Sequence, residues 1–226
     1  MKVLVACELS GTVRDAFRAK GHDAWSCDIQ PCDGDNTYHF QQDVTEIIYN
    51  DCWELLIAHP PCTYLSNSGS LRLYKGGKKA NGIDRDRWEK MVKAAVFFRL
   101  FLCADIPKIC VENPVIHGHA MEHIGEKYIQ TIQPYQFGHP ESKRTCLWLK
   151  GLPELKPTNI LTKPECGYWD NQCPGGQNKL GPSPTRAKDR SKTYQGIAEA
   201  MANQWGQEKL ILGPTQRIIT FDEAEG

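Results

Sequence analysis

The 226-residue sequence contains no apolar run approaching the roughly 20 residues that a membrane helix needs. Residues 1–6 are apolar, but they lack the longer apolar core and the cleavage site of a secretory signal. We therefore expect a cytoplasmic protein without a membrane partner. Internal repeats are also missing. With 40% hydrophobic and 24% charged residues, the composition is that of an ordinary globular chain, which excludes a disordered or fibrous protein.

Net charge is absent as well, because 27 Lys and Arg balance 27 Asp and Glu. A global field that attracts nucleic acid is therefore excluded. The charges are nevertheless unevenly spread: residues 143–192 carry ten basic and four acidic side chains, and residues 207–226 carry two basic and four acidic ones. A basic face suits a phosphate-bearing substrate, although a solvated surface explains the same pattern.

Cysteine, by contrast, is abundant, with ten residues scattered along the chain. Without a secretion signal we expect reduced thiols, mostly packed as small hydrophobes, and no disulfide framework. Cys166 and Cys173 have six residues between them and no second pair nearby, which makes a poor zinc site. His117, His119 and His123 are equally weak as a metal cluster. We therefore predict no metal.

Short apolar runs alternate with helical patterns along most of the chain. Buried strands are predicted at residues 2–7, 23–29, 53–59, 106–111 and 146–149, and helices at residues 12–19, 44–49, 85–103 and 197–205. Residues 30–40 are polar and contain Pro, Gly and Asn, which predicts a loop. Residues 71–84 are rich in Gly and Lys and show no periodic pattern, which predicts a mobile loop. The alternation predicts an α/β fold with a Rossmann-like, mostly parallel sheet and helices on both faces.

Chemically capable residues follow four of the predicted strands, at residues 8–11, Asp28, 59–62 and 112–114. Ligands of open parallel sheets bind beyond the carboxyl ends of the strands. This coincidence places a candidate site at that edge of the sheet.

The loop Pro60-Pro61-Cys62 places a thiol directly after two prolines at a strand end. A stiff loop gives the rigid placement that a nucleophile needs, although a half-buried structural thiol is the alternative. Glu112-Asn113-Pro114 follows another strand, where a carboxyl can hydrogen-bond a heterocycle or hold a proton for it. The alternative for Glu112 is a turn residue that caps the next helix.

These elements together resemble the DNA cytosine-5 methyltransferase family, and especially its short phage-type members. Pro60-Pro61-Cys62, followed by Ser66, is similar to the family's nucleophile loop, and Glu112-Asn113 to its Glu-Asn motif. Residues 137–144 resemble the Gly-x-Pro-Gln-x-Arg stretch that supports the target base. The motifs occur in family order over about residues 2–206. The resemblance implies the S-adenosylmethionine-dependent methyltransferase fold, in a bacterial or phage-infected host cell.

The resemblance also implies roles for individual residues. Cys62 would add to carbon 6 of cytosine as a thiolate while Glu112 hydrogen-bonds or protonates ring nitrogen 3, with Arg144 assisting. The implied cofactor is S-adenosylmethionine, held by Cys7, Glu8, Ser10, Gly11, Asp28, Ile29, Asp43, Pro60 and Ala198. The implied substrate-binding residues are Pro61, Ser66, Asn113 and Lys143. Lys143 and Arg144 compete for one role, because a one-residue gap decides which of them aligns.

Two departures from the family pattern stand out. The loop at residues 7–11 has one glycine where the family has two, and Glu8 could either bind the cofactor ammonium or cap the helix. Residues 150–192 form a basic, Pro- and Gly-rich insert of 43 residues where relatives carry a larger target-recognition domain. We expect one methyltransferase domain at residues 1–206, this insert within it, and a tail at 207–226.

The expected partner is DNA, whose target base must leave the duplex stack to react. The short insert leaves RNA or a free cytosine nucleotide open as substrates of the same chemistry. A third hypothesis is a catalytically silent relative that binds nucleic acid or cofactor. The sequence does not indicate the oligomeric state.

Overall fold

A computed structural model describes residues 1–181 and 191–207 of the protein. Residues 182–190 of the predicted insert, and the predicted tail from residue 208 onward, lie outside the described residues. Within the described ranges, no helix combines the length and the apolarity that a membrane span requires.

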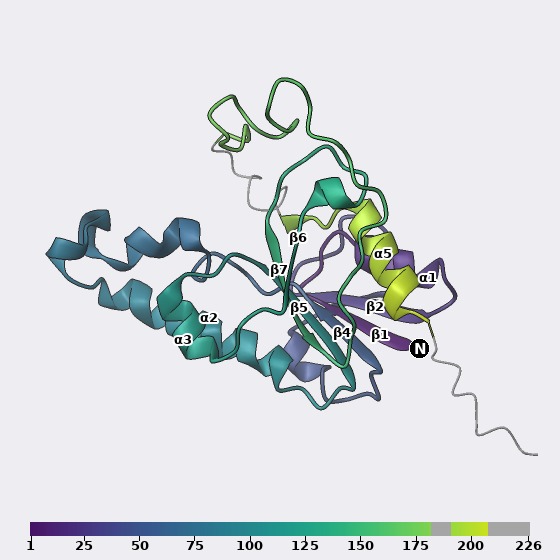
Figure 1. Ribbon diagram of the computed structural model, residues 1–226. Helices are drawn as coiled ribbons and strands as arrows, with labels where there is room; N and C mark the ends of the chain where they lie inside the picture. Colours follow the sequence, from purple (N-terminus) through teal and green to yellow (C-terminus); the bar gives the residue numbers. More distant parts are fainter. Residues whose placement is uncertain (182–190, 208–226) are drawn as a thin grey trace, which may run out of the picture.

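The centre of the fold is a seven-stranded sheet in the order β3-β2-β1-β4-β5-β7-β6 (Figure 1). Neighbouring strands from β3 to β5 pair in parallel, and β7 runs antiparallel to both β5 and β6. The predicted Rossmann-like, mostly parallel sheet is therefore confirmed. The strands are β1 (Lys2–Ala6), β2 (Asp23–Asp28), β3 (His39–Gln41), β4 (Leu55–Ala58), β5 (Lys108–Pro114), β6 (Gln130–Ile132) and β7 (Thr145–Lys150).

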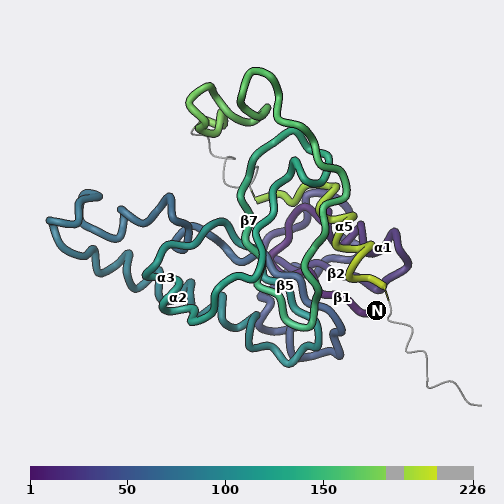
Figure 2. The backbone as a smooth tube through the Cα atoms, in the orientation of Figure 1, coloured from purple at the N-terminus to yellow at the C-terminus, as the bar shows by residue number. Residues whose placement is uncertain are grey.

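Helices cover both faces of this sheet, as predicted. On one face, α1 (Thr12–Arg18) packs against α5 (Gln195–Trp205), and on the other, α2 (Arg85–Leu102) packs against α3 (Gly118–Ile124). The path of the chain through the two layers can be followed in Figure 2. Short 3-10 turns complete the described elements: η1 (Val44–Glu46), η2 (Asn67–Leu73), η3 (Lys75–Gly77), η4 (Lys79–Asn81) and η5 (Pro134–Gln136).

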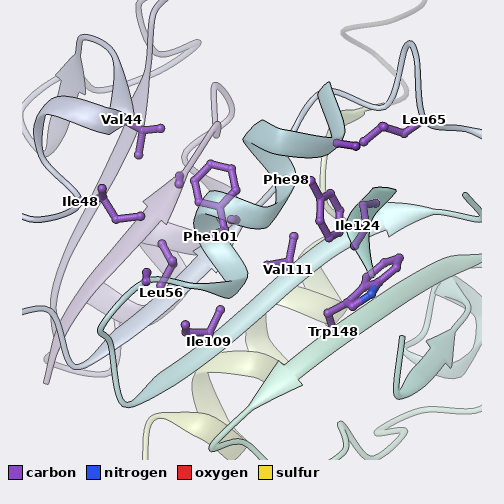
Figure 3. Close-up of a cluster of buried hydrophobic side chains, with 14 of the residues drawn as sticks. Val44, Ile48, Leu56, Leu65, Phe98, Phe101, Ile109, Val111, Ile124 and Trp148 are labelled. Atoms are coloured by element: carbon purple, nitrogen blue, oxygen red, sulfur yellow. The ribbon is translucent and has the colours of Figure 1, made fainter. Parts of the chain in front are cut away.

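The alternation of side chains along each strand supplies two apolar cores. In β1, Leu4 and Ala6 face the α2 layer, whereas Val3 and Val5 face the α1 and α5 layer. Figure 3 shows the α2 core, where the ring of Phe98 packs edge-on against Trp148 at a centroid distance of 4.9 Å. Because both faces of the central strands are fully buried, the sheet is a rigid base for whatever its strand ends carry.

Two stretches that were predicted as loops contain more structure than the sequence indicated. The expectation of loop throughout residues 30–40 is wrong at its end, because His39 and Phe40 begin the short edge strand β3. The stretch after Cys62 forms η2, η3 and η4, and the amide of Asp84 donates to the Leu73 carbonyl at 2.9 Å where the chain returns. This turn-rich segment extends away from the sheet together with the start of α2 (Figure 1).

Candidate functional site

The strand order reverses between β1 and β4, which is where open parallel sheets of this kind bind ligands. The loops after these two strands leave side by side, because Ala6 pairs with Ala58 and the amide of His59 donates to the Ala6 carbonyl at 2.9 Å. One loop carries Cys7 and Glu8, and the other carries Pro60, Pro61 and Cys62. The candidate site is therefore built on the switch point of the sheet.

The loop after β1 turns sharply through two residues with positive φ, Cys7 at 58° and Gly11 at 69°. A non-glycine residue in this left-handed region is uncommon and costs free energy, so the turn at Cys7 is held by its surroundings. Burial raises the pKa of the Cys7 thiol well above its ordinary value. Cys7 is therefore a neutral thiol in a constrained turn.

Glu8 is buried in this loop and acts on helix α1. Its carboxylate accepts the backbone N–H of Val13 at 2.7 Å and that of Arg14 at 3.2 Å. These are amides of the first turn, which have no partner within the helix itself. Helix capping, one of the two roles left open by the sequence, thus occupies both oxygens of Glu8. A cofactor contact by Glu8 stays a prediction.

Replacing Glu8 by alanine is expected to destabilise the fold by about 1–3 kcal/mol at acid pH, because two buried amides lose their acceptor. Burial raises the pKa of Glu8, against the opposing effects of His59 and of the two amides. A raised carboxyl pKa stabilises the fold below the ordinary pKa, and this contribution is lost as pH rises through the folded-state value.

The loss caused by Glu8→Ala should therefore be smaller at neutral pH than at acid pH. Urea denaturation at the two pH values measures it. Glu199→Ala is the control, since Glu199 is exposed on α5 and should change the free energy of unfolding by less than about 0.5 kcal/mol. No loss at either pH would contradict the capping role, and a loss that grows with pH would show that the amides outweigh burial and lower the pKa of Glu8.

The loop after β4 is fixed on both sides of Cys62, once to β5 and once to the residue that follows β5. The side-chain amide of Asn113 donates to the Pro60 carbonyl at 2.8 Å, and the amide of Asn67 donates to the Val115 carbonyl at 2.8 Å. The Cys62 carbonyl accepts the amides of Leu65 and Ser66 at 3.0 and 2.9 Å, which closes a tight turn. Cys62 is thus held rigidly beside the end of β5, as the Pro-Pro pair predicted.

Glu112 lies on β5 and pairs with His59 across the end of β4. His59 Nδ1 and Glu112 Oε2 are 2.7 Å apart, and the exposed fractions of the two side chains are only 9% and 11%. Burial raises the pKa of Glu112, but the hydrogen bond from His59 and the charges of Lys143 and His59 outweigh it, so the net pKa is below the ordinary value. Glu112 is therefore ionised at neutral pH in the ligand-free protein.

A single cavity of about 1130 Å³ brings the predicted chemical groups together. All three predicted catalytic residues, Cys62, Glu112 and Arg144, line it. So do all four predicted substrate-binding residues, Pro61, Ser66, Asn113 and Lys143. These residues come from three separate parts of the chain, which the sheet assembles at the ends of β4 and β5 and before β7. This volume is sufficient for a nucleotide.

Lys143 and Arg144 occupy different positions on this cavity. The ammonium of Lys143 donates to the Lys192 carbonyl at 3.2 Å, lies 5.7 Å from the Tyr194 ring centre, and its charge acts on Glu112. Arg144 is more exposed, and its charge acts on the Cys146 thiol instead. The charge of Lys143 thus acts on Glu112, whereas the family resemblance gave the assisting role to Arg144.

The residues predicted to hold the cofactor are spread along a neighbouring part of the same edge. Pro60 lines the cavity, and Cys7, Ser10 and Gly11 form the turn after β1. Asp28 ends β2 half-buried, and burial raises its pKa, while Ile29 beside it is 71% exposed. Asp43 caps η1 through the amide of Thr45 at 2.9 Å. Ala198 is fully buried in the core beneath α5, so the structure does not bring it to the cavity.

The described part of the insert also contributes to the cavity, which the sequence did not indicate. Asn171 is joined to Ser142 by two hydrogen bonds, of 3.1 Å to its amide and 2.9 Å to its carbonyl. Gln172, Asn178 and Lys179 join Asn171 in the cavity lining. Trp169 is buried, and its ring stacks on that of Tyr135 with the ring centroids 4.7 Å apart.

All ten cysteines lie in the described residues and are free thiols. Among the side chains that the structure describes, no group of three or more His, Cys, Asp or Glu is placed to hold a metal ion.

Comparison with known proteins finds weak structural similarity. No protein-family model and no curated protein sequence matches the chain. One similar solved structure is described as a candidate DNA modification methyltransferase encoded within a prophage of E. coli, with 15% identity and a TM-score of 0.43. The match covers 70% of this chain and only 51% of that one, so this chain spans about half the length of that protein. A likeness of this size is too weak to assign a function.

Proposed function

We propose that the protein is a methyltransferase that transfers a methyl group from S-adenosylmethionine to carbon 5 of cytosine in DNA. The observation that carries this proposal is the convergence of Cys62 and Glu112 on one cavity at the switch point of the sheet. A thiol on a rigid loop and a carboxyl on the next strand are the two groups that activation of a cytosine ring requires.

In this proposal Cys62 is the nucleophile. Carbon 5 of cytosine is too electron-poor to take a methyl group unaided, and a Cys62 thiolate that adds to carbon 6 makes carbon 5 enamine-like. Glu112 protonates ring nitrogen 3, which draws the electrons of the 5,6 double bond toward the ring nitrogen as the sulfur–carbon bond forms. After carbon 5 has taken the methyl group, the carbon-5 proton leaves to water, the thiolate leaves carbon 6, and the nitrogen-3 proton returns to Glu112, which restores the ring.

The ends of β1 and β2 fit an adenosyl group by their chemistry. A carboxylate at the end of the second strand is the usual ligand of ribose hydroxyls in Rossmann-like sheets, and Asp28 occupies that place. The exposed side chain of Ile29 offers apolar surface for a purine beside it. S-adenosylmethionine bound there would supply an electrophilic methyl group.

The charges of the cavity fit a nucleic-acid substrate. Five cationic side chains and two carboxylates line it: Arg72, Lys143, Arg144, Lys179 and Lys192, with Glu112 and Glu141. Lysine and arginine contacts to phosphates provide affinity without sequence information. This supports DNA binding with relaxed site choice, in which one base leaves the stack and enters the cavity.

Nucleoside mass spectrometry tests the proposal. The protein is incubated with S-adenosylmethionine and, in separate reactions, with duplex DNA, single-stranded RNA and dCMP. We expect 5-methylcytosine in DNA. The modified nucleoside in RNA or dCMP alone would keep the chemistry and change the substrate. No modified nucleoside in any reaction would favour a silent binding protein over an enzyme.

A further inference from the structure

His59 is the one imidazole in the cavity lining among the described residues, and it is joined directly to Glu112. Its backbone is fixed between the two central strands by the hydrogen bond from its amide to Ala6. Its Nδ1 lies 2.7 Å from Glu112 Oε2, and both side chains are nearly buried. A contact this short, in which one partner is ionised, is a strong hydrogen bond that fixes the orientation of both groups.

The protons of this pair can be placed from its contacts. A carboxylate only accepts, so Nδ1 carries the proton and donates it to Oε2. The second ring nitrogen, Nε2, is buried and has no hydrogen-bond partner within the described structure. Among the described residues, the second carboxylate oxygen of Glu112, Oε1, has none either. The hydrogen bond within the pair therefore occupies Nδ1 of His59 and Oε2 of Glu112, and Oε1 of Glu112 is available to a ligand.

Charged and titratable groups from the elements packed around the pair set its electrostatics. The carboxylate of Glu8, on the loop after β1, acts on His59 from one side. The ammonium of Lys143, on the loop before β7, acts on Glu112 from the other. Besides burial itself, the charge of Glu112 also raises the pKa of the buried thiols of Cys110 on β5 and Cys146 on β7.

We propose, on the basis of the proposed function, that His59 is a positioning residue that makes Glu112 a stronger proton donor to ring nitrogen 3. In the reacting complex, Oε1 of Glu112 carries the proton and passes it to nitrogen 3 as the Cys62 sulfur bonds carbon 6. His59 keeps its own proton and stabilises, through Nδ1, the carboxylate that this transfer leaves behind. Once carbon 5 carries the methyl group, water takes the carbon-5 proton as the thiolate leaves carbon 6, and the nitrogen-3 proton returns to Oε1, so atoms and charge balance over the cycle.

Glu112 is ionised in the free protein, so it must take up a proton before it can act as an acid. Burial alone would raise the pKa of Glu112 and give a weak acid with a large protonated population, whereas the contact to His59 acts in the opposite direction. Protonation of Glu112 takes up one proton from solution, and ionisation of the Cys62 thiol releases one. The falling limb of the pH–rate profile therefore reports the protonated fraction of Glu112.

The test compares His59→Ala with His59→Asn and with the control His123→Ala, an exposed histidine of α3. An asparagine amide reaches about as far as Nδ1 and can donate to Oε2, whereas alanine cannot. Carbon-13 NMR of the Glu112 carboxyl, assigned by its loss in Glu112→Gln, reports the titration midpoint of Glu112 in the ligand-free proteins.

We expect the Glu112 midpoint to move to higher pH in His59→Ala, to move less in His59→Asn, and to stay unchanged in His123→Ala. The pH profile of the single-turnover rate of DNA methylation should change in the same order. Its falling limb should move to higher pH in His59→Ala, less in His59→Asn, and not in His123→Ala. The limiting rate of that variant should drop about 10- to 100-fold, the range expected for loss of a hydrogen bond to a charged group.

An unchanged Glu112 midpoint in His59→Ala would overturn the role of His59, whatever the activity. If His59→Asn raises the Glu112 midpoint and lowers the limiting rate as much as His59→Ala does, the donated hydrogen bond is not the cause and the proposal is wrong. If the Glu112 midpoint shifts in His59→Ala as expected but the wild-type protein methylates no substrate, the proposed function is wrong. The electrostatic coupling of His59 to Glu112 would then still stand.

Discussion

Replacing Cys62 by alanine is expected to lower the rate of cytosine methylation by about 10⁴- to 10⁶-fold, the range seen when an enzyme loses its nucleophile. The reason is chemical, because without the sulfur–carbon bond carbon 5 never becomes electron-rich enough to take the methyl group. Single-turnover kinetics on duplex DNA, with products quantified by mass spectrometry, measures the loss.

The matched control is Cys103→Ala. Cys103 is an exposed thiol at the end of α2 and does not line the cavity that contains Cys62. We expect wild-type rates for this variant, and similar binding of S-adenosylhomocysteine by both variants in calorimetry. Substantial methylation by Cys62→Ala would show that another group activates the ring, and the assignment of the nucleophile would then be wrong.

Replacing Glu112 by glutamine is expected to lower the same rate by about 10²- to 10⁴-fold, the usual contribution of a general acid. Glutamine keeps the size of the side chain and an oxygen that can accept from His59, but it has no proton of suitable acidity for nitrogen 3. Single-turnover rates across a pH series measure the loss, and the falling limb that Glu112 imposes on the wild-type profile should disappear.

Glu89→Gln is the control for this change, because Glu89 is exposed on α2 and lies outside the cavity lining. Its rate and its pH profile should match those of the wild type. A Glu112→Gln protein that keeps the wild-type profile would mean that the carboxyl on β5 neither supplies nor controls a proton.

The central strands and the long helices were predictable from sequence because burial leaves a strong local signal. All four residues of β4 are buried, and such an uninterrupted apolar run has few alternatives to a central strand. Helix α2 begins after Asp84, whose side chain accepts the amide of Arg87 at 3.1 Å, at the place that its apolar periodicity predicted. Strands β3 and β6 have three residues each, too few for any pattern to stand out.

The chemical groups of the site were predictable one by one, but their arrangement was not. Cys62 and Glu112 each follow an apolar run, and the rule for parallel sheets places both at one edge. The hydrogen bond between His59 and Glu112 spans 53 positions in sequence, and the contact between Asn171 and Ser142 spans 29. Nothing in the local sequence around these residues indicates such pairings, because they depend on the strand order.

The capping role of Glu8 could be stated in advance only as one of two alternatives. The choice depends on where the first amides of α1 point, and this is set by the two positive-φ residues of the loop. A residue type alone cannot distinguish a carboxylate that caps a helix from one that binds a ligand.

Trapping on DNA that contains 5-fluorocytosine tests most directly whether Cys62 and Glu112 form one reactive pocket. Fluorine at carbon 5 cannot leave as a proton does, so the sulfur–carbon bond should persist after methyl transfer. Intact mass and peptide mapping should place one nucleotide on Cys62, with adduct formation slowed in Glu112→Gln and absent in Cys62→Ala. An adduct on another residue, or one that forms equally fast without the Glu112 carboxyl, would contradict the account.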